Sequence, residues 1–193
     1  MDNRLKLLER YSTPAKALAD PAPDEDQLNQ ILEIAMSAPD HGRLRPYRFI
    51  TIRGDARHAL SEVFGRATKQ RDPDVPDDYL KKQKDKPLRS PLIVVVVASP
   101  QASEKIPEIE QILSAGAAAH NILLASNAIG FGSVWLTGAN AYDAFVCEAL
   151  GLNTSEKIIG FIYLGTAKYD MSRSETPDLA DKLSNWSHAA TIS

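Results

Sequence analysis

The segment that most constrains the fold runs from Ile106 to Gly130 and reads as one long helix. Pro107 suits the first turn of a helix, Glu108 favours its positive end, and Gly130 can take the left-handed conformation that ends it. At about 1.5 Å per residue, the segment makes a rod of roughly 38 Å. Because almost no charge follows Ile112, we expect the helix to be buried on nearly every face.

The middle of this helix, from Ala115 to Ala119, carries only very small side chains. Such a thin section lets another backbone, a second subunit or a flat ligand approach the helix closely. The chain of 193 residues fits one domain, 1–193, which is small for covering a long apolar helix with its own sheet. The segment therefore favours a homodimer, and an ordinary core helix is the open alternative.

The rest of the chain reads as alternating strands and helices. Strands are expected at 47–52, 92–98, 133–136 and 158–164. Helices are expected at 5–9, 24–36, 55–71 and 142–150, with a mobile helical excursion or lid at 72–89 and a polar tail at 168–193. The pattern predicts a two- or three-layer α/β arrangement with few strands and much helix.

Composition narrows the class of function. A net charge of −3 and the lack of a basic stripe argue against a nucleic-acid partner. The single cysteine, Cys147, cannot form an internal disulfide and favours a reducing, cytoplasmic location. No run is apolar enough for a signal peptide or a membrane span, so we expect no membrane contact. The four histidines show no metal-ligand spacing, and no metal site is predicted.

Familiar catalytic motifs are absent from the sequence. There is no GxGxxG after a strand, no Walker-type phosphate loop, no HExxH and no GxSxG. The polar residues that stand out are of binding type, namely Arg10, Tyr11, Ser12, Ser37, His41, Arg43 and Arg45. Arginine suits a phosphate or a polarised carbonyl because its donors form a fixed fork. The set could hold a phosphorylated cofactor, and surface charge with helix caps explains it about as well.

Several blocks of the sequence, in order, resemble the nitroreductase family of FMN-dependent NAD(P)H oxidoreductases, and within it a small bacterial branch. They cover about residues 1–167 and read ERYS, PAPDEDQLNQILEIAMSAPDHGRLRPYRFITI, SPLIVVVVA, SAGAAAHNILLASNAIGFGSVWLTGA and KIIGFIYLGT. The resemblance implies an α+β sandwich in which helices flank a central, mostly antiparallel sheet. It also implies an entwined homodimer built on the long helix, with two FMN sites at the subunit interface.

The resemblance also assigns ligand contacts to residues of this chain. Contacts to the FMN phosphate and ribityl oxygens fall on Arg10, Tyr11 and Ser12. Further FMN contacts fall on Ser37 and His41, and contacts along the flavin from the partner side fall on Trp135, Leu136 and Thr137. A stretch matched to nicotinamide-nucleotide binding comprises Ala125, Ser126, Asn127, Ala128, Ile129 and Gly130.

Some positions depart from the family pattern. Tyr11 replaces a second arginine at the phosphate end, and Leu136 replaces an arginine of the closer relative. Arg45 and Tyr47 stand where the family usually has Gln and Trp. The late arginine that larger members place on the phosphate has no clear counterpart, and the candidates for its place are Lys168 and Arg173.

No side chain is predicted to be catalytic, because a flavin carries the redox chemistry and the protein need only bind, orient and polarise it. We predict that hydride passes from NAD(P)H through the flavin to a small oxidised acceptor, such as a nitroaromatic or a quinone, with ping-pong kinetics. The 72–89 segment is expected to shape acceptor entry. Two alternatives stay open, an FMN-storage protein with negligible turnover and a cofactor-free dimeric interaction module. The sequence does not distinguish NADH from NADPH.

Overall fold

The computed structural model describes residues 10–169 and 178–186, so the helix predicted at 5–9 lies outside the described residues. The strands are β1 (Leu18–Ala19), β2 (Tyr47–Arg53), β3 (Leu92–Ala98), β4 (Gly132–Leu136) and β5 (Lys157–Ala167). The helices are α2 (Glu25–Ala35), α3 (Ala56–Arg71), α4 (Asp77–Lys84), α5 (Glu108–Ala128) and α6 (Ala144–Ala149). Short 3-10 helices are η1 (Ala15–Ala17), η2 (His41–Arg43), η3 (Lys86–Arg89), η4 (Ala139–Tyr142) and η5 (Leu179–Asp181).

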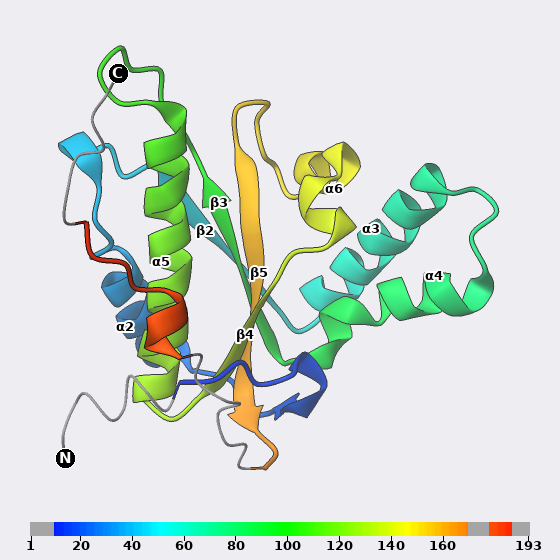
Figure 1. Cartoon of the computed structure of the whole chain (residues 1–193). Helices are drawn as coiled ribbons and strands as arrows, with labels where there is room; N and C mark the ends of the chain where they lie inside the picture. Colours follow the sequence, from blue (N-terminus) through cyan, green and yellow to red (C-terminus); the bar gives the residue numbers. More distant parts are fainter. Residues whose placement is uncertain (1–9, 170–177, 187–193) are drawn as a thin grey trace.

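These elements form three layers, with α2 and α5 on one side of the sheet and α3, α4 and α6 on the other (Figure 1). Every strand pairing in the described residues is antiparallel. β3 lies between β2 and β5, and the far edge of β5 pairs with β4 and β1. The sheet thus matches the antiparallel arrangement that the family resemblance implies. The alternating order of elements predicted the layers but not the strand direction, because α3 and α4 connect antiparallel neighbours.

The sheet separates two hydrophobic cores. Alternate residues of a strand point to opposite faces. On the α3 side, Phe161 of β5 meets Phe64 of α3 with the rings edge to face, 5.4 Å between centroids. On the α5 side, Ile162 and Leu164 of β5 join Ile122 of α5. All seven residues of β3 are buried, which confirms the prediction of a strand covered on both faces.

α2 begins at the predicted cap and leads to part of the candidate site. The Asp24 carboxylate accepts the backbone N–H of Gln27 at 2.8 Å, and the Gln27 side chain accepts the N–H of Asp24 at 3.0 Å. Both acidic residues of the first turn, Glu25 and Asp26, complement the helix dipole. The helix ends at Ala35, before the loop that carries the predicted binding residues.

α5 is the predicted long helix, with 21 residues, but one of its faces is open in a single chain. Ala115, Ala118 and Ala119 are completely buried, whereas Ile109 and Leu113 are 59% and 64% exposed. The expectation of burial on nearly every face is therefore wrong for one chain, because the five-stranded sheet covers only one side of the helix. Within the described residues, no helix is long and apolar enough to cross a membrane.

Glu156 anchors the start of β5 to its neighbours. Arg48 of β2 donates to both carboxylate oxygens of Glu156, at 2.6 and 2.9 Å, and the Ser99 hydroxyl donates at 2.6 Å. The hydrogen bonds from Arg48 lower the pKa of Glu156 from an ordinary 4.5 to about 2. The Glu156 side chain is only 6% exposed, whereas that of Arg48 is 38% exposed, so the carboxylate is shielded from solvent while its partner reaches the surface, and the pair fixes the strand end.

We expect Glu156→Gln to lower the free energy of unfolding by about 1–3 kcal/mol at neutral pH, because Arg48 loses its charged acceptor. As the pH falls, the unfolded chain protonates Glu156 near 4.5, while the folded chain keeps it ionised down to about 2. The stabilisation is therefore present above pH 4.5, is lost between 4.5 and 2, and is missing from the variant.

Urea unfolding of both proteins at several pH values measures this effect. Glu62→Gln is the control, because the Glu62 side chain is 67% exposed in its pair with Lys84 and should contribute less than about 0.5 kcal/mol. Equal stability losses in the two variants would contradict the role given to Glu156.

Candidate functional site

The predicted phosphate contacts Arg10, Tyr11 and Ser12 lie beside the start of β4. The next residue, Thr13, is buried, and its N–H donates to the carbonyl of Ser133 at 2.9 Å. Arg10 and Tyr11 are half-buried, and Ser12 is exposed. The backbone hydrogen bond therefore holds this segment against the first residues of the strand.

The predicted ring contacts Trp135, Leu136 and Thr137 lie at the other end of β4. The indole N–H of Trp135 donates to the Ile159 carbonyl at 3.1 Å, and the ring lies over Gly160, where a Cβ would collide with it. Leu136 and Thr137 are exposed. From Ser133, which holds the first group, to Leu136 in the second is three steps along the strand, or about 10 Å at about 3.4 Å each.

His41 lies away from this strand, near the start of α5, whereas Ser37 lies just after α2, beside the second half of α5. The Ser37 hydroxyl donates to a carbonyl of α2 at 2.7 Å, and His41 Nδ1 lies 2.7 Å from a carboxylate oxygen of Glu110. At the other end of α5, the hydroxyl of Ser126 hydrogen-bonds that of Ser133 in β4 at 3.0 Å. The 16 residues between these two helix positions span about 24 Å. One chain therefore keeps His41 apart from the predicted contacts on β4, whereas Ser37, whose acceptor Ile34 is also bonded to Asn121 at 3.3 Å, lies between the two along α5.

The loop that carries His41 has a strained backbone. Arg43 and Arg45 have positive φ angles of 57° and 48°, a left-handed conformation that is uncommon outside glycine. The Asp40 carboxylate supports it by accepting the N–H of Arg45 at 2.6 Å. Both arginines are exposed, so the loop places two cations beside His41.

The stretch matched to nicotinamide binding spans the end of α5. Ala125 and Ser126 are buried, and Asn127 is half-buried. The exposed members are Ala128, Ile129 and Gly130. Only the second half of the stretch therefore offers surface to a ligand.

A cavity that the sequence did not reveal lies next to the end of β4, on the α3 side of the sheet. This inner cavity has a volume of about 430 Å³, and residues 135–138 form one wall. Its nitrogen donors include Lys86 and Arg89 from η3 and Asn140 from η4, and Thr137 and Tyr163 add hydroxyl groups. Its remaining side chains are aromatic, and they are Phe64, Phe161 and Tyr163.

Lys86 and Arg89 make the inner cavity electropositive. Burial, followed by the charges of Arg89 and Arg71, lowers the pKa of Lys86. A Cβ at Gly138 would lie 3.9 Å from Lys86 Nζ, so the ammonium group lies against the backbone that follows β4. The sequence placed both cations only within or at the end of the excursion expected at 72–89. The signal that could have revealed these two cations is their position around Pro87, directly before a buried strand.

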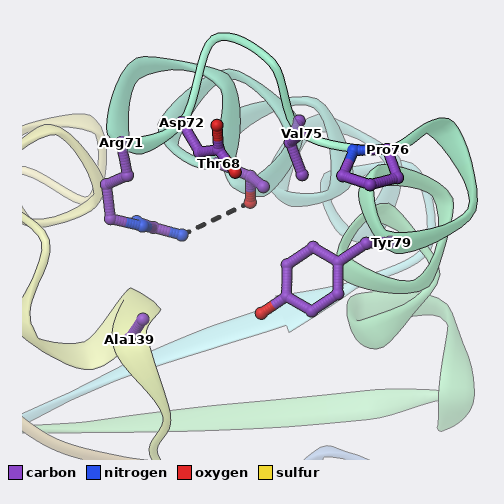
Figure 2. Close-up of a pocket in the computed structure, with 7 residues that line it drawn as sticks. All are labelled: Thr68, Arg71, Asp72, Val75, Pro76, Tyr79 and Ala139. Atoms are coloured by element: carbon purple, nitrogen blue, oxygen red, sulfur yellow. Dashed lines mark hydrogen bonds between the residues drawn. The ribbon is translucent and has the colours of Figure 1, made fainter.

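A second, outer cavity of about 380 Å³ lies between the end of α3, the loop to α4, and η4 (Figure 2). Figure 2 shows the guanidinium of Arg71 and the ring of Tyr79 reaching into this space from different sides, with Ala139 on a third side. Tyr79 belongs to the 72–89 segment, so that segment contributes to both cavities.

Arg71 forms the boundary between the two cavities. It forms an ion pair with Asp143, and its Nη2 donates to Asn140 Oδ1 at 2.8 Å and to Thr68 Oγ1 at 3.3 Å. Asp143 also accepts the N–H of Phe145 at 3.0 Å and so caps α6. Arg71 thereby joins α3 to η4 and α6.

We expect Arg71→Ala to lower the free energy of unfolding by about 1–3 kcal/mol, because it leaves Asn140 and Asp143 without their charged partner. Lys81→Ala removes a cation from the exposed pair with Asp85 and should cost less than about 0.5 kcal/mol. Chemical denaturation of both variants makes the comparison. A loss no greater for Arg71 than for Lys81 would show that the boundary is not fixed by this side chain.

The sequence matches known proteins over most of its length. The model of the Nitroreductase family matches residues 7–166. The protein named "Putative NAD(P)H nitroreductase YdjA" from Escherichia coli strain K12 is 39% identical over 179 residues, which cover 92% of this chain and 96% of that protein. A "Putative NAD(P)H nitroreductase" from Haemophilus influenzae is 36% identical over 167 residues, covering 86% of this chain and 89% of its own.

Solved structures show the same fold. A nitroreductase-like family protein from Bacillus cereus superposes with a TM-score of 0.82 at 20% identity, covering 96% of both chains. A structure titled as a nitroreductase in complex with FMN, from Desulfovibrio desulfuricans, has a TM-score of 0.73 at 23% identity and covers 98% of this chain and 99% of that one. These likenesses confirm the nitroreductase-like fold that the sequence resemblance implied. The match to the family model over residues 7–166 and the relative of 39% identity show that the chain belongs to the nitroreductase family.

Proposed function

We propose that this chain is an FMN-dependent oxidoreductase that passes hydride from NAD(P)H to a small oxidised acceptor of the nitroaromatic or quinone type, with ping-pong kinetics. Family membership and the names of its relatives support the reaction class. The observation that carries the proposal is β4, which has the predicted phosphate contacts at one end and the predicted ring contacts at the other.

The residues present along β4 fit FMN. Arg10 supplies positive charge and Ser12 a hydroxyl at the end that would hold the phosphate. Trp135 and the backbone up to Gly138 would hold the ring, at a spacing of about 10 Å that suits a ribityl chain between phosphate and ring. Lys86 lies at the ring end, where it compensates for the arginine that Leu136 replaces.

Bound FMN supplies the hydride-transfer chemistry, and the side chains of the protein serve to bind and polarise it. The positive potential from Lys86 and Arg89 favours an electron-rich ring edge at the inner cavity. The indole of Trp135 packs on the α5 side and bonds to Ile159, which fixes the strand whose backbone forms one wall of the inner cavity. No side-chain acid or base is assigned to the reaction.

A homodimer completes the proposed site. On α5, Ile109, Leu113, Gly116 and His120 follow one another at helical spacing and form one uncovered face. A Cβ at Gly116 would meet nothing within 4 Å, so a second helix has room to approach there. Exposed apolar side chains of α2, Ile34 and Met36, extend this face.

His41 contacts Glu110, the residue after Ile109, and so lies beside the same uncovered face. We infer that each FMN contacts β4 of one chain and Ser37 and His41 of the other. The ring contacts 135–137 then come from the chain that holds the phosphate, and not from the partner side as the resemblance implied. The outer cavity, with Tyr79 at its edge, would then form part of the entrance for the acceptor. The exposed residues 128–130 are where the nicotinamide-binding stretch could touch a nucleotide.

The phosphate end is tested with Arg10→Ala in dialysed protein. We expect the variant to bind FMN about 10- to 100-fold more weakly, because a charge-assisted contact to the phosphate is lost. Its affinity for riboflavin should not change, since riboflavin has no phosphate. Quenching of Trp135 fluorescence in a Trp186→Phe background measures both affinities, because Trp186 is 86% exposed and would add a separate signal.

Lys69→Ala, which removes an exposed cation from α3, is the control and should leave both affinities unchanged. Reduction of bound FMN by NADH and by NADPH in an anaerobic stopped-flow experiment then separates an oxidoreductase from a storage protein. A wild-type protein whose melting temperature ignores FMN, or whose bound FMN is reduced by neither nucleotide, would refute the proposed function.

The dimer is tested with Leu113→Lys, which places a charge on the uncovered face of α5. We expect the dimer to dissociate at least about 100-fold more readily, because an unpaired charge would be buried at the interface. Light scattering over a range of concentrations measures the mass. Leu88→Lys, at an exposed leucine on η3, should leave the dimer intact. A wild-type protein that is monomeric at every concentration would contradict the paired site.

A further inference from the structure

The inner cavity contains donors that lack acceptors. In the part of the chain that the structure describes, three buried side-chain nitrogens have no hydrogen-bond partner. Two of them, Arg89 Nε and Asn140 Nδ2, belong to residues that line this cavity. Buried donors normally find partners, because an unpaired one costs free energy. Two unpaired donors at one cavity therefore point to a ligand that supplies acceptors.

The orientation of the Asn140 amide follows from its neighbour. Arg71 has only donors, so it must face the amide oxygen of Asn140, and it does so at 2.8 Å. The nitrogen of Asn140 must then face the other way. Asn140 is only 3% exposed, and its nitrogen has no partner among the described residues. The ion pair of Arg71 with Asp143 keeps this arrangement in place.

The inner cavity selects for an electron-rich ligand edge. Its charged lining residues are Lys86 and Arg89, and no carboxylate lines it. The nearby carboxylate of Asp143 is already occupied by Arg71. The other walls are flat aromatic rings and the strand end 135–138, so the space suits a planar ring that presents carbonyl oxygens.

We propose that Asn140 donates its amide N–H to a carbonyl oxygen of the flavin ring, and that Asp143 and Arg71 act as positioning residues that hold the amide in the donating orientation. The inference rests on the proposed function, since it takes FMN as the ligand. It assigns ring recognition to η4, an element outside all of the contacts predicted from the sequence. Asn140 then contributes to the choice of a carbonyl-bearing ring over other flat ligands, and Lys86 and Arg89 add positive potential at the same edge.

The test is Asn140→Asp, which is nearly isosteric. The carboxylate still accepts from Arg71 but offers the ring an acceptor in place of a donor. We expect the affinities for FMN and for riboflavin to fall together by about 10- to 100-fold, because both ligands carry the same ring. The midpoint potential of the bound flavin should become more negative, since a negative charge disfavours the electron-rich reduced ring. A purely structural role for Asn140 would not shift this potential.

Asn29→Asp makes the same chemical change at an exposed position of α2 and should alter neither affinity nor potential. Asn140→Ser, with a smaller side chain, gives the same affinity test if the carboxylate variant does not fold. FMN and riboflavin affinities within about twofold of wild type, with an unchanged potential, would overturn the proposal. That result differs from failure of the proposed function, in which the wild-type protein itself binds no FMN. It also differs from the Arg10→Ala result, which separates FMN from riboflavin.

Discussion

The pairing of β5 on both of its edges is the constraint on which the rest of the structure depends. One edge hydrogen-bonds to β3, and the other holds β4 and then β1. Because β4 is fixed along β5, its two ends lie at a set distance, and the residues beside them become the two ends of one site. The Arg48–Glu156 pair secures the start of β5. A core of large side chains on each face keeps the strand from shifting, since a slip by one residue would exchange its faces.

The inner cavity is electropositive because Lys86 and Arg89 line it and no carboxylate does. Burial, together with the charges of Arg89 and Arg71, lowers the pKa of Lys86. The one nearby carboxylate among the described residues, Asp143, forms its ion pair with Arg71. A polar group held in a partly dry cavity acts more strongly than it would in water. Lys86 and Arg89 therefore give a positive potential near the end of β4 that would hold the ring. This potential would stabilise a redox cofactor whose ring gains electron density on reduction.

Local signals in the sequence predicted much of the fold. The helix expected from residue 24 is capped by Asp24, β3 is the expected buried strand, and the long helix covers nearly the expected range. The prediction that one chain buries this helix on nearly every face was wrong. An apolar residue such as Leu113 indicates a buried position, but the sequence does not say whether its own chain or a second chain covers it. β1 was not predicted either, since two residues carry no periodicity.

From the sequence, only those site residues that belong to the family motifs could be predicted. Arg10 and Trp135 carry motifs, and the structure places them at opposite ends of β4. Lys86, Arg89 and Asn140 lie outside the sequence blocks that carry the resemblance, and their common cavity exists only after η3 and η4 fold against α3. Likewise, the positive φ angles near His41 depend on tertiary contacts such as the hydrogen bond from Gln101 to Leu44.

The central claim is that FMN lies along β4 of one chain and is completed by a second chain. A crystal structure of the FMN-loaded protein tests it most directly. The account predicts a two-chain particle with the phosphate near Arg10 and Ser12, the ring at residues 135–138, and Ser37 and His41 of the other chain on the same FMN. An FMN held entirely by one chain, or lying away from β4, would contradict it.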